Sequence, residues 1–544
     1  MKKNDKIVLK IEDVFFPNKG VGYIEQQKVI VKNTLPQQKV LACVTKKRSG
    51  AIEARLEEVL IKSPFEQQSA CPHFALCGGC TYQNMKREAE LAMKEKQVKT
   101  LLQQAQIKIE SWEGIVPSPK ETAYRNKCEF SFGDEQKDGA LALGMRKRQS
   151  YYEVVTLTDC NIVDKDYLSI IDATLAFFQK RNVAFYHKMR HDGTLRHLVV
   201  RKGEATGEIL VNLVTSSEVN FSLEEYKQTL LSLQLEGNIC GILHTKNDGI
   251  ADVVKSDQTV ILYGRNYFIE KLFELEFKIS AFSFFQTNSK GAEKLYSIVK
   301  EFAGDIKNKV VFDLYCGTGT IGQIMAKHSK KVIGIELVEE AVEAANENAK
   351  RNGLTNCEFI AGDVLKKVEE LKEKPDFIIV DPPRDGIHPK AIDKIIAFDA
   401  PEIVYVSCKP TSLARDLQLF QQAGYQIKRI KLMDMFPRTA HVETVVLLSK
   451  GEIDSKKVRV EFSLEDMDMS GFQKGATYEQ IKTYVLEHTG LKVSSLYISQ
   501  IKRKCGLDVG QNYNLSKKED AKVPQCPPEK EAAIMEALKY FQMI

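Results

Sequence analysis

The chain has 544 residues, of which 43% are hydrophobic, so its length allows roughly three to four domains with buried cores. Its 78 basic and 73 acidic residues leave a formal net charge of +5, which permits nucleic acid as a partner without requiring it. The charged N-terminus leads into no long apolar stretch and no apolar run approaches the roughly 18 residues that span a membrane, which predicts a cytoplasmic protein with 12 reduced cysteines.

Residues 1–62 contain short apolar pieces, such as Val29–Val31 and Val40–Val44, which turn residues separate. Several short strands at this spacing predict a small OB-like β-barrel. The basic cluster Lys46–Arg48 either faces a phosphate backbone or forms a solvated hairpin tip.

Three cysteines follow on a short loop that contains Pro and Gly, and Cys71, Cys77 and Cys80 have C-x5-C-x2-C spacing. A structural zinc site usually pairs two C-x2-C knuckles, whereas one knuckle with a wider arm favours an iron–sulfur cluster held by four thiolates. Zinc stays the alternative. Cys160 is the expected fourth ligand, and Cys128 is the second choice.

The central region mixes helix and strand patterns. Residues 84–105 are rich in Lys, Glu, Gln, Ala and Leu and predict one long helix, which we expect to pack on the catalytic domain. Residues 123–270 are mainly strand-like, with helical patterns near 164–181 and 222–235. We therefore expect a central α+β domain over residues 63–275 that carries the iron–sulfur site.

From about residue 280, apolar strands alternate with helical segments, which predicts a doubly wound, Rossmann-like α/β domain over residues 276–450. The first strand ends at Asp313, and a glycine loop follows, Gly317-Thr-Gly319-Thr-Ile-Gly, with Glu336 where a ribose-binding acid would stand. This spacing alone also fits NAD. An acid at the strand tip suits the amino group of a methionine moiety better than a pyrophosphate, so S-adenosylmethionine is the predicted cofactor.

Two later strands end in reactive side chains. Asp381 opens the sequence Asp381-Pro-Pro-Arg384, in which two prolines stiffen the backbone and aim the carboxylate at the polar edge of a base. A rigid strand-to-helix connection is the alternative. Cys408 ends the next strand, at the edge where open α/β sheets bind ligands. The thiolate is the attacking form, and the cations Lys409 and Arg415 would favour it.

A thiol in such a pocket suits methylation of a pyrimidine carbon. Addition of the thiolate to carbon 6 of uracil turns carbon 5 into a nucleophile that accepts a methyl group. A base must then remove the proton at carbon 5 before the thiol leaves. Glu443, at the start of the last strand, is the predicted base, and His441 is the alternative.

Residues 451–544 predict an acidic linker and a small tail of three short helices. The first two helices have a helix-turn-helix outline, which suggests a nucleic-acid-binding module. Because basic and acidic residues are equal in number after residue 451, a protein-binding or stabilising appendage is an equal alternative. The expected signals are a capping box of Thr477 with Gln480, a stop at Gly490, starts at Ser494 or Ser495 and at Pro527, and nucleic-acid contacts from Gln500, Lys502, Arg503 and Lys504.

The motifs together resemble those of the RNA uracil-5-methyltransferases, in particular the branch that methylates 23S ribosomal RNA and carries a [4Fe–4S] cluster. The resemblance spans about residues 5–450 and leaves the tail outside. It implies that the N-terminal barrel is a TRAM domain, that Cys408 is the nucleophile and that Glu443 is the base. The matching pieces are the three clustered cysteines with Cys160, Phe284–Asn288, Asp313–Gly319, Asp381–Arg384, Ser407-Cys408 and His441–Glu443.

The resemblance also assigns binding residues. Phe284 would stack near a flipped uracil. Contacts with RNA are expected from Arg125 and Lys127 and from Arg196 and His197, with ordinary strand-surface charges as the alternative. The expected cofactor-binding residues are Gln286, Asp313, Tyr315, Gly317, Gly319, Glu336 and Asp381, with Asp363 near the adenine.

We therefore expect a monomeric enzyme that methylates carbon 5 of a uridine in 23S ribosomal RNA, because the tRNA branch of the family lacks the cysteine cluster. A tRNA uridine-5 methyltransferase and a catalytically inactive iron–sulfur RNA-binding protein are the alternatives. Retention of Cys408, Glu443, Asp381 and the glycine loop argues against the inactive protein. RNA cytosine-5 methylation would need a second cysteine in the slot that Arg384 occupies.

Overall fold

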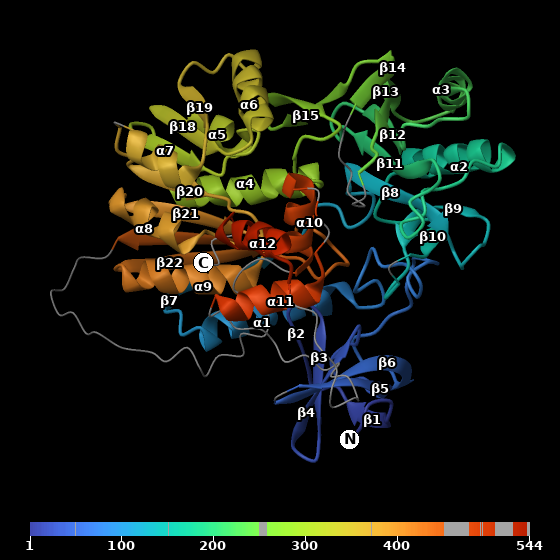
Figure 1. The fold of residues 1–544 in the computed structure, drawn as a ribbon. Helices are drawn as coiled ribbons and strands as arrows, with labels where there is room; N and C mark the ends of the chain where they lie inside the picture. Colours follow the sequence, from blue (N-terminus) through green and yellow to red (C-terminus); the bar gives the residue numbers. More distant parts are fainter. Residues whose placement is uncertain are drawn as a thin grey trace. The chain divides into compact units, whose positions relative to one another are not determined.

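The fold is known from a computed structural model of the 544-residue chain. The structure describes residues 1–48, 50–150, 152–249, 258–371, 373–450, 478–489, 491, 493–505 and 526–540. The chain divides into two compact units, Met1–Ile453 and Asp454–Ile544. The first unit contains three large sheets, and the described residues of the second form three helices (Figure 1).

The first sheet comprises six short strands in the order β1-β5-β6-β4-β3-β2. Alternate residues face its core, as in β5, where Val40, Ala42 and Val44 are buried. Tyr82 and Met85, which follow the three cysteines, also pack into this core. The strands are β1 (Lys6–Lys10), β2 (Asp13–Phe15), β3 (Lys19–Ile24), β4 (Gln27–Lys32), β5 (Lys39–Arg48) and β6 (Ala51–Ile61).

The second sheet has seven strands in the order β10-β9-β8-β11-β12-β13-β14, and two helices accompany it. Both helices begin at an N-cap side chain, Asp164 for α2 and Ser222 for α3, close to the expected starts. Its elements are β8 (Lys127–Asp134), β9 (Leu141–Arg146), β10 (Val154–Thr156), α2 (Lys165–Lys180), β11 (Leu195–Lys202), β12 (Glu208–Thr215), α3 (Leu223–Leu231), β13 (Asn238–Lys246) and β14 (Gln258–Gly264).

The third sheet is the expected doubly wound sheet, with strand order β19-β18-β17-β20-β21-β23-β22-β7. The five strands from β19 to β21 are parallel, and β23 is antiparallel to both of its neighbours. The strands are β7 (Ile109–Val116), β17 (Val310–Leu314), β18 (Lys331–Glu336), β19 (Cys357–Ala361), β20 (Phe377–Val380), β21 (Glu402–Ser407), β22 (Tyr425–Met433) and β23 (Glu443–Lys450).

Helices cover both faces of this sheet because successive strand residues point to opposite sides. Val404 and Val406 pack into a core with α4 and α5, whereas Ile403 and Tyr405 pack into a core with α8 and α9. A hairpin of β15 (Tyr267–Leu272) and β16 (Leu275–Ser280) joins the first of these cores. The helices are α4 (Ser289–Ala303), α5 (Thr320–Ala326), α6 (Glu339–Arg351), α7 (Val364–Glu370), α8 (Pro389–Ala397) and α9 (Pro410–Gln422).

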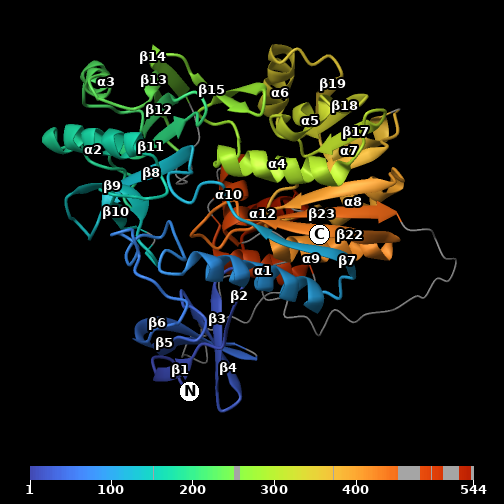
Figure 2. The ribbon, with the colours of Figure 1, turned by 180° about the vertical axis from the view of Figure 1, so that it is seen from behind.

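One helix and one strand from the region before the second sheet join the third sheet. The expected long helix is α1 (Arg87–Gln104), whose Val98 and Leu102 enter the core of the third sheet. Strand β7, which the sequence analysis did not predict, adds to the sheet edge parallel to β22 (Figure 2). Its residues are mostly half-buried, and Arg429 and Lys431 of β22 pair with its Glu113.

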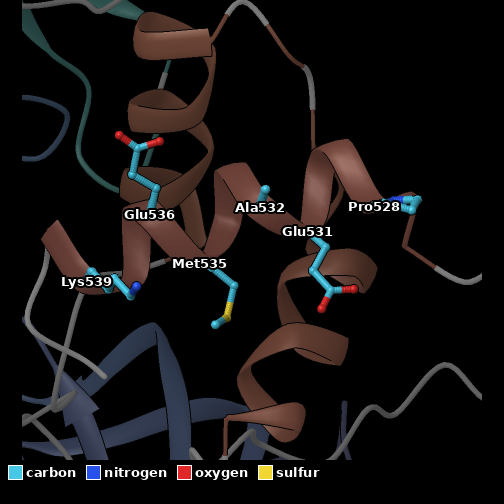
Figure 3. Close-up of a pocket in the computed structure, with 6 residues that line it drawn as sticks. All are labelled: Pro528, Glu531, Ala532, Met535, Glu536 and Lys539. Carbon is cyan, nitrogen blue, oxygen red and sulfur yellow. The ribbon is translucent and has the colours of Figure 1, made fainter.

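The second unit contains the three expected helices, α10 (Tyr478–Thr489), α11 (Ser495–Lys504) and α12 (Pro528–Tyr540), around a small apolar core. Ser494 caps α11 by accepting a hydrogen bond from the backbone N–H of Tyr497. A cavity of about 610 Å³ lies along one face of α12, beside Met535 and Glu536 (Figure 3). The signals expected at Thr477 and Gly490 lie outside the described residues.

Three of the side chains expected to contact nucleic acid from α11 have partners within the second unit or are buried there. Lys502 is only 6% exposed, and the side-chain oxygen of Gln500 accepts a hydrogen bond from the backbone N–H of Cys526 at 3.0 Å. Lys504 pairs with Glu531 of α12. A recognition helix needs its contacting side chains to face solvent, so the buried Lys502 does not fit that role. Lys504 is exposed, and nucleic-acid contacts from Gln500, Arg503 and Lys504 stay a prediction. Among the helices in the described part of the chain, none is long and apolar enough to cross a membrane.

Candidate active site

The expected site residues gather at one edge of the third sheet. The glycine loop follows β17, and β18 and β20 flank β17, so the strand order reverses there. Ligands of open α/β sheets bind beyond the strand ends at such a reversal. Asp381 follows β20 and Cys408 follows β21. Because β23 is antiparallel to β21, its first residue, Glu443, lies at the same edge as Cys408.

The glycine loop turns sharply over the end of β18. Tyr315, Gly317 and Gly319 all have positive φ angles, of 64°, 53° and 69°. A non-glycine residue in this region carries strain, which is common at functional sites. A Cβ atom on Gly319 would lie 2.6 Å from the ring of Phe359, so only glycine fits there. The N–H of Gly317 donates to a carboxylate oxygen of Glu336 at 3.0 Å, which ties the loop to β18.

Asp313 lies beneath this loop and is fully buried. Its Oδ2 accepts a hydrogen bond from the N–H of Gly322 at 2.8 Å. Its Oδ1 is also buried, and within the described residues it has no hydrogen-bond partner. Burial raises the pKa of Asp313 to about 8. One oxygen therefore supports the loop, and the other is an acceptor that fits a ligand donor such as an amino group.

The other expected cofactor residues border the same edge. Asp363 is exposed just after β19, and its charge adds to the burial that raises the pKa of Tyr315 to about 12. Gln286 lies on the loop before α4, and its carbonyl accepts a hydrogen bond from the Asn126 side chain at 2.9 Å. Phe284 on the same loop is 69% exposed, as a base-stacking ring would require.

Two acids, the buried Glu443 and the half-buried Asp381, act on the Cys408 thiol through their charges. Burial, followed by the charges of Glu443 and Asp381, raises the pKa of Cys408 to about 11. Burial and the charge of Asp381 raise the pKa of Glu443 to about 8, and burial raises that of Asp381 to about 7. Burial, with the charge of Arg384, lowers the pKa of His441 to about 4, so this ring is neutral at pH 7.

The cation that assists Cys408 is Arg384, a role that the sequence analysis missed. Its charge lowers the pKa of both Cys408 and Glu443. The expected role of Arg415 is wrong, because its guanidinium pairs with Asp416 and donates to the carbonyl of Asp385 at 2.9 Å. Lys409 also faces Asp385, with its Nζ 4.0 Å from the carboxylate. The position of Arg384 three residues after Asp381 was the available signal.

The segment with Cys160 meets the loop with Cys71, Cys77 and Cys80. Nε2 of His73 accepts a hydrogen bond from the N–H of Thr158 at 3.2 Å, and the side chains of Gln83 and Asn161 bond to each other at 2.7 and 3.1 Å. Cys160 lies between Thr158 and Asn161. The Arg148 guanidinium donates to the carbonyls of Phe74, Cys77 and Cys80, which closes the loop.

The four thiols are the kind of ligand that an iron–sulfur cluster needs, although in this structure they are not grouped around a common centre. In the part of the chain that the structure describes, no three His, Cys, Asp or Glu side chains are grouped closely enough to hold a metal ion. Burial raises the pKa of Cys80 to about 11 and that of Cys160 to about 12, and each sulfur raises the pKa of others. A bound cation would offset this repulsion and let the sulfurs ionise. The charge of Cys80 also raises the pKa of Cys128, so both candidates for the fourth ligand lie near the Cys80 sulfur.

The family of the chain follows from comparison with known proteins. Residues 86–451 match the model of the family described as tRNA (Uracil-5-)-methyltransferase. The chain belongs to this family. An RNA methyltransferase of uncharacterized specificity from Clostridium tetani is 51% identical over 450 residues, covering 83% of this chain and 99% of the relative. A second such relative, from Clostridium acetobutylicum, is 52% identical over 450 residues, again 83% of this chain and 99% of the relative.

A solved structure shares the fold. The Pyrococcus abyssi tRNA (uracil-54, C5)-methyltransferase, in complex with S-adenosyl-L-homocysteine, superimposes with a TM-score of 0.65 and 27% identity. The match covers 81% of this chain and 100% of that structure. The third sheet is thus the methyltransferase fold of the family, and the helical second unit lies beyond the residues that match the family.

Two of the expected RNA contacts are buried. Arg196 is 3% exposed, and its guanidinium donates to the carbonyls of Asn247 and Gly249 at 2.7 and 2.8 Å. His197 is 5% exposed, and burial lowers its pKa to about 3. Arg196 ties β11 to the segment that follows β13, and because both side chains are buried, the expected direct contact with RNA is wrong for both. The sequence placed them on a strand without showing that both faces of β11 are covered.

Proposed function

We propose that the protein transfers a methyl group from S-adenosylmethionine to carbon 5 of a specific uridine in 23S ribosomal RNA. The observation that carries this proposal is the meeting of the Cys408 thiol with the buried Glu443 carboxyl at the edge that holds the glycine loop. The proposed division of the chain is a TRAM barrel over residues 1–62, a central domain over 63–275, the catalytic domain over 276–450 and the tail over 451–544. The protein acts as a monomer.

The proposed reaction begins at Cys408. Its thiol gives its proton to water, and the thiolate sulfur bonds to carbon 6 of the extruded uracil. The π bond between carbons 5 and 6 breaks, and its electron pair is shared between carbon 5 and the carbonyl oxygen on carbon 4. S-adenosylmethionine supplies the methyl group that carbon 5 then takes. Glu443 removes the proton from carbon 5, the carbon–sulfur bond breaks, and the thiolate is restored. Arg384 favours the thiolate at the first and last steps.

The cofactor would lie along the glycine loop. Asp313 Oδ1, which lacks a partner within the described residues, fits the amino group of the methionine moiety. The other proposed contacts are Gln286, Tyr315, Gly317, Gly319, Glu336, Asp363 and Asp381. Leu337 and Val338 follow Glu336 and are 68% and 51% exposed, so apolar surface is available for an adenine ring.

The step that releases RNA should depend on pH. Glu443 takes up a proton only as a carboxylate, and its pKa is raised to about 8. Below that pH most of the carboxyl is protonated, so the release rate should rise about tenfold per pH unit and level off above about pH 8. Single-turnover release rates from about pH 6 to 10 measure this. A profile that falls as pH rises would exclude Glu443 as the base.

The target RNA separates two candidate functions. The cysteine cluster supports 23S ribosomal RNA, whereas the fold shared with the Pyrococcus abyssi tRNA methyltransferase supports tRNA. We expect the purified protein, with methyl-labelled S-adenosylmethionine, to form 5-methyluridine in a 23S transcript and none in a tRNA pool. The matched control is the Cys408→Ala protein. Methylation of tRNA alone would assign the second function.

The four cysteines Cys71, Cys77, Cys80 and Cys160 are proposed to hold a [4Fe–4S] cluster. Such a cluster, when bound, would neutralise the buried thiolates and order the cysteine loop. Anaerobically purified protein should therefore contain about four irons and sulfide per chain. Cys160→Ser should lower the iron content, and Cys128→Ser serves as its control. Stoichiometric zinc with no iron, or iron loss from the Cys128 variant alone, would contradict this assignment.

A further inference from the structure

The loop that leads into the proposed base is held by residues that lie more than 300 positions earlier in the sequence. Residues 434–442, which we call the base loop, connect β22 to Glu443 at the start of β23. Most of the groups that bind this loop belong to residues 81–124, from the end of the cysteine loop through α1 and beyond. Figure 2 shows β7 beside β22, with α1 close to β7.

A buried ion network fixes the start of the base loop. Asp434 is fully buried, and its Oδ1 lies 2.6 Å from Nζ of Lys94. Arg87 pairs with the other carboxylate oxygen of Asp434. Lys94 also pairs with Glu90, one helical turn earlier, at 2.8 Å, and both side chains have no exposed surface. Removal of one partner would leave an uncompensated buried charge.

The same network fixes the middle of the base loop at Arg438. This residue has a φ angle of 66°, and its N–H donates to Oε1 of Glu90 at 2.8 Å. Its carbonyl accepts hydrogen bonds from the N–H groups of Thr81 and Tyr82 at 2.8 and 2.9 Å. The Tyr124 hydroxyl donates to the neighbouring carbonyl of Pro437 at 3.0 Å. A strained backbone position is therefore held by four hydrogen bonds.

Internal contacts carry this constraint to the end of the loop. The Thr439 hydroxyl donates to the carbonyl of Phe436 at 2.7 Å and accepts from the N–H of His441 at 3.2 Å. Two residues later, Glu443 pairs with Met433 in the β22–β23 register. The carboxyl of Glu443 is thus placed by a loop whose start, middle and end are all fixed.

We propose that Glu90, Lys94 and Asp434 are positioning residues that set the Glu443 carboxyl against the proton at carbon 5. The inference deepens the proposed function and rests on it. The residues touch neither RNA nor cofactor and act only through the base loop. Because Thr81 follows Cys80 directly, the order of the cysteine loop reaches Glu443 through the same contacts.

The test separates the attack of Cys408 from the release of RNA. Lys94→Met keeps an unbranched side chain that is one heavy atom shorter, and it removes the charge. In single-turnover reactions of the full-length protein with the RNA transcript that the parent methylates, the rate of adduct formation should stay within about twofold of the parent. Release should slow by about 10²-fold, as a displacement near 1 Å of a reacting group can produce, so protein–RNA adduct accumulates.

A matched variant and a milder variant complete the design. Lys431→Met removes a lysine from the same strand, β22, that pairs with Glu113 and Glu301 and does not contact the base loop, so both of its rates should equal those of the parent. Tyr124→Phe removes only the hydroxyl that holds Pro437 and should slow release alone, by several-fold. If Lys94→Met does not fold, Tyr124→Phe is the variant that tests the inference.

Four outcomes would contradict the inference. Unchanged release in a folded Lys94→Met protein overturns it, as does an equal fall of attack and release in that variant. If Lys94→Met does not fold, unchanged release in Tyr124→Phe overturns it. A parent protein that forms no covalent adduct overturns the proposed function and the inference with it, so the two failures are distinguishable.

Discussion

Cys408→Ala should abolish both turnover and the covalent protein–RNA adduct. Carbon 5 of uracil is a poor nucleophile, so it needs the help of a thiolate. Among the described residues, the other thiol that follows a strand at this edge is Cys316 of the glycine loop, which packs against the core formed with Phe359. Without the bond from sulfur to carbon 6, the ring does not gain the charge that attacks the methyl group. We therefore expect no product, with cofactor binding retained.

RNA that contains 5-fluorouracil tests for the covalent adduct directly, because it traps the adduct. Fluorine at carbon 5 cannot leave as a proton, so the parent protein should form an adduct that survives denaturation. The alanine variant should form none. Cys240→Ala, a half-buried cysteine of β13 outside this edge, should behave like the parent. Methylation at the parental rate by the Cys408 variant would exclude the covalent mechanism.

The environment of Cys408 disfavours its thiolate in the protein alone. With a pKa of about 11, only about one thiol in 10⁴ is ionised at pH 7. Two carboxyls oppose the thiolate, and Arg384 is the cation that favours it. Protonation of Glu443 or Asp381, both with raised pKa values, removes part of this opposition. Attack is therefore favoured while these acids are neutral, and release is favoured once Glu443 has ionised.

The methyltransferase sheet could be predicted from the sequence because each strand carries a local signal. Strands β17 to β21 are short apolar runs, and each is followed by a glycine loop, an acid, a proline pair or a thiol. Strand β7 has no such signal. Its segment, Ile109–Val116, contains Trp, Gly and two acids, and it becomes a strand only because the edge of β22 is open to it. Pairing over some 300 residues of separation is set by tertiary packing rather than by local propensity.

The candidate site was predictable residue by residue, but its charge balance was not. Asp313, Asp381, Cys408 and Glu443 were expected because they stand at strand ends, and the structure brings those ends together. Sequence proximity selected Lys409 and Arg415 as the assisting cations, whereas the fold turns Arg415 toward Asp416. The buried partners of the base loop had no signal either, because α1 and Asp434 are more than 300 residues apart.

Glu443→Gln should permit attack and methyl transfer and stall the release of RNA. Glutamine keeps the shape of the side chain, and an amide cannot take up the proton from carbon 5. A general base typically contributes about 10²–10⁴-fold, so release should slow by about that factor. The adduct with natural RNA, which is transient in the parent, should then accumulate and be visible on a denaturing gel.

The nearby histidine supplies the comparison that decides the assignment. His441 is half-buried and neutral at pH 7, with a pKa lowered to about 4, so it is able to accept a proton but binds it weakly. If Glu443 is the base, His441→Asn should release RNA at close to the parental rate, and the Glu443→Gln protein should lose the rise in release rate toward pH 8. Accumulation of adduct in the histidine variant, with normal release in the glutamine variant, would instead make His441 the base. A proton acceptor with a pKa near 8 holds the proton through the release step at neutral pH, whereas one with a pKa near 4 does not, and this difference favours Glu443.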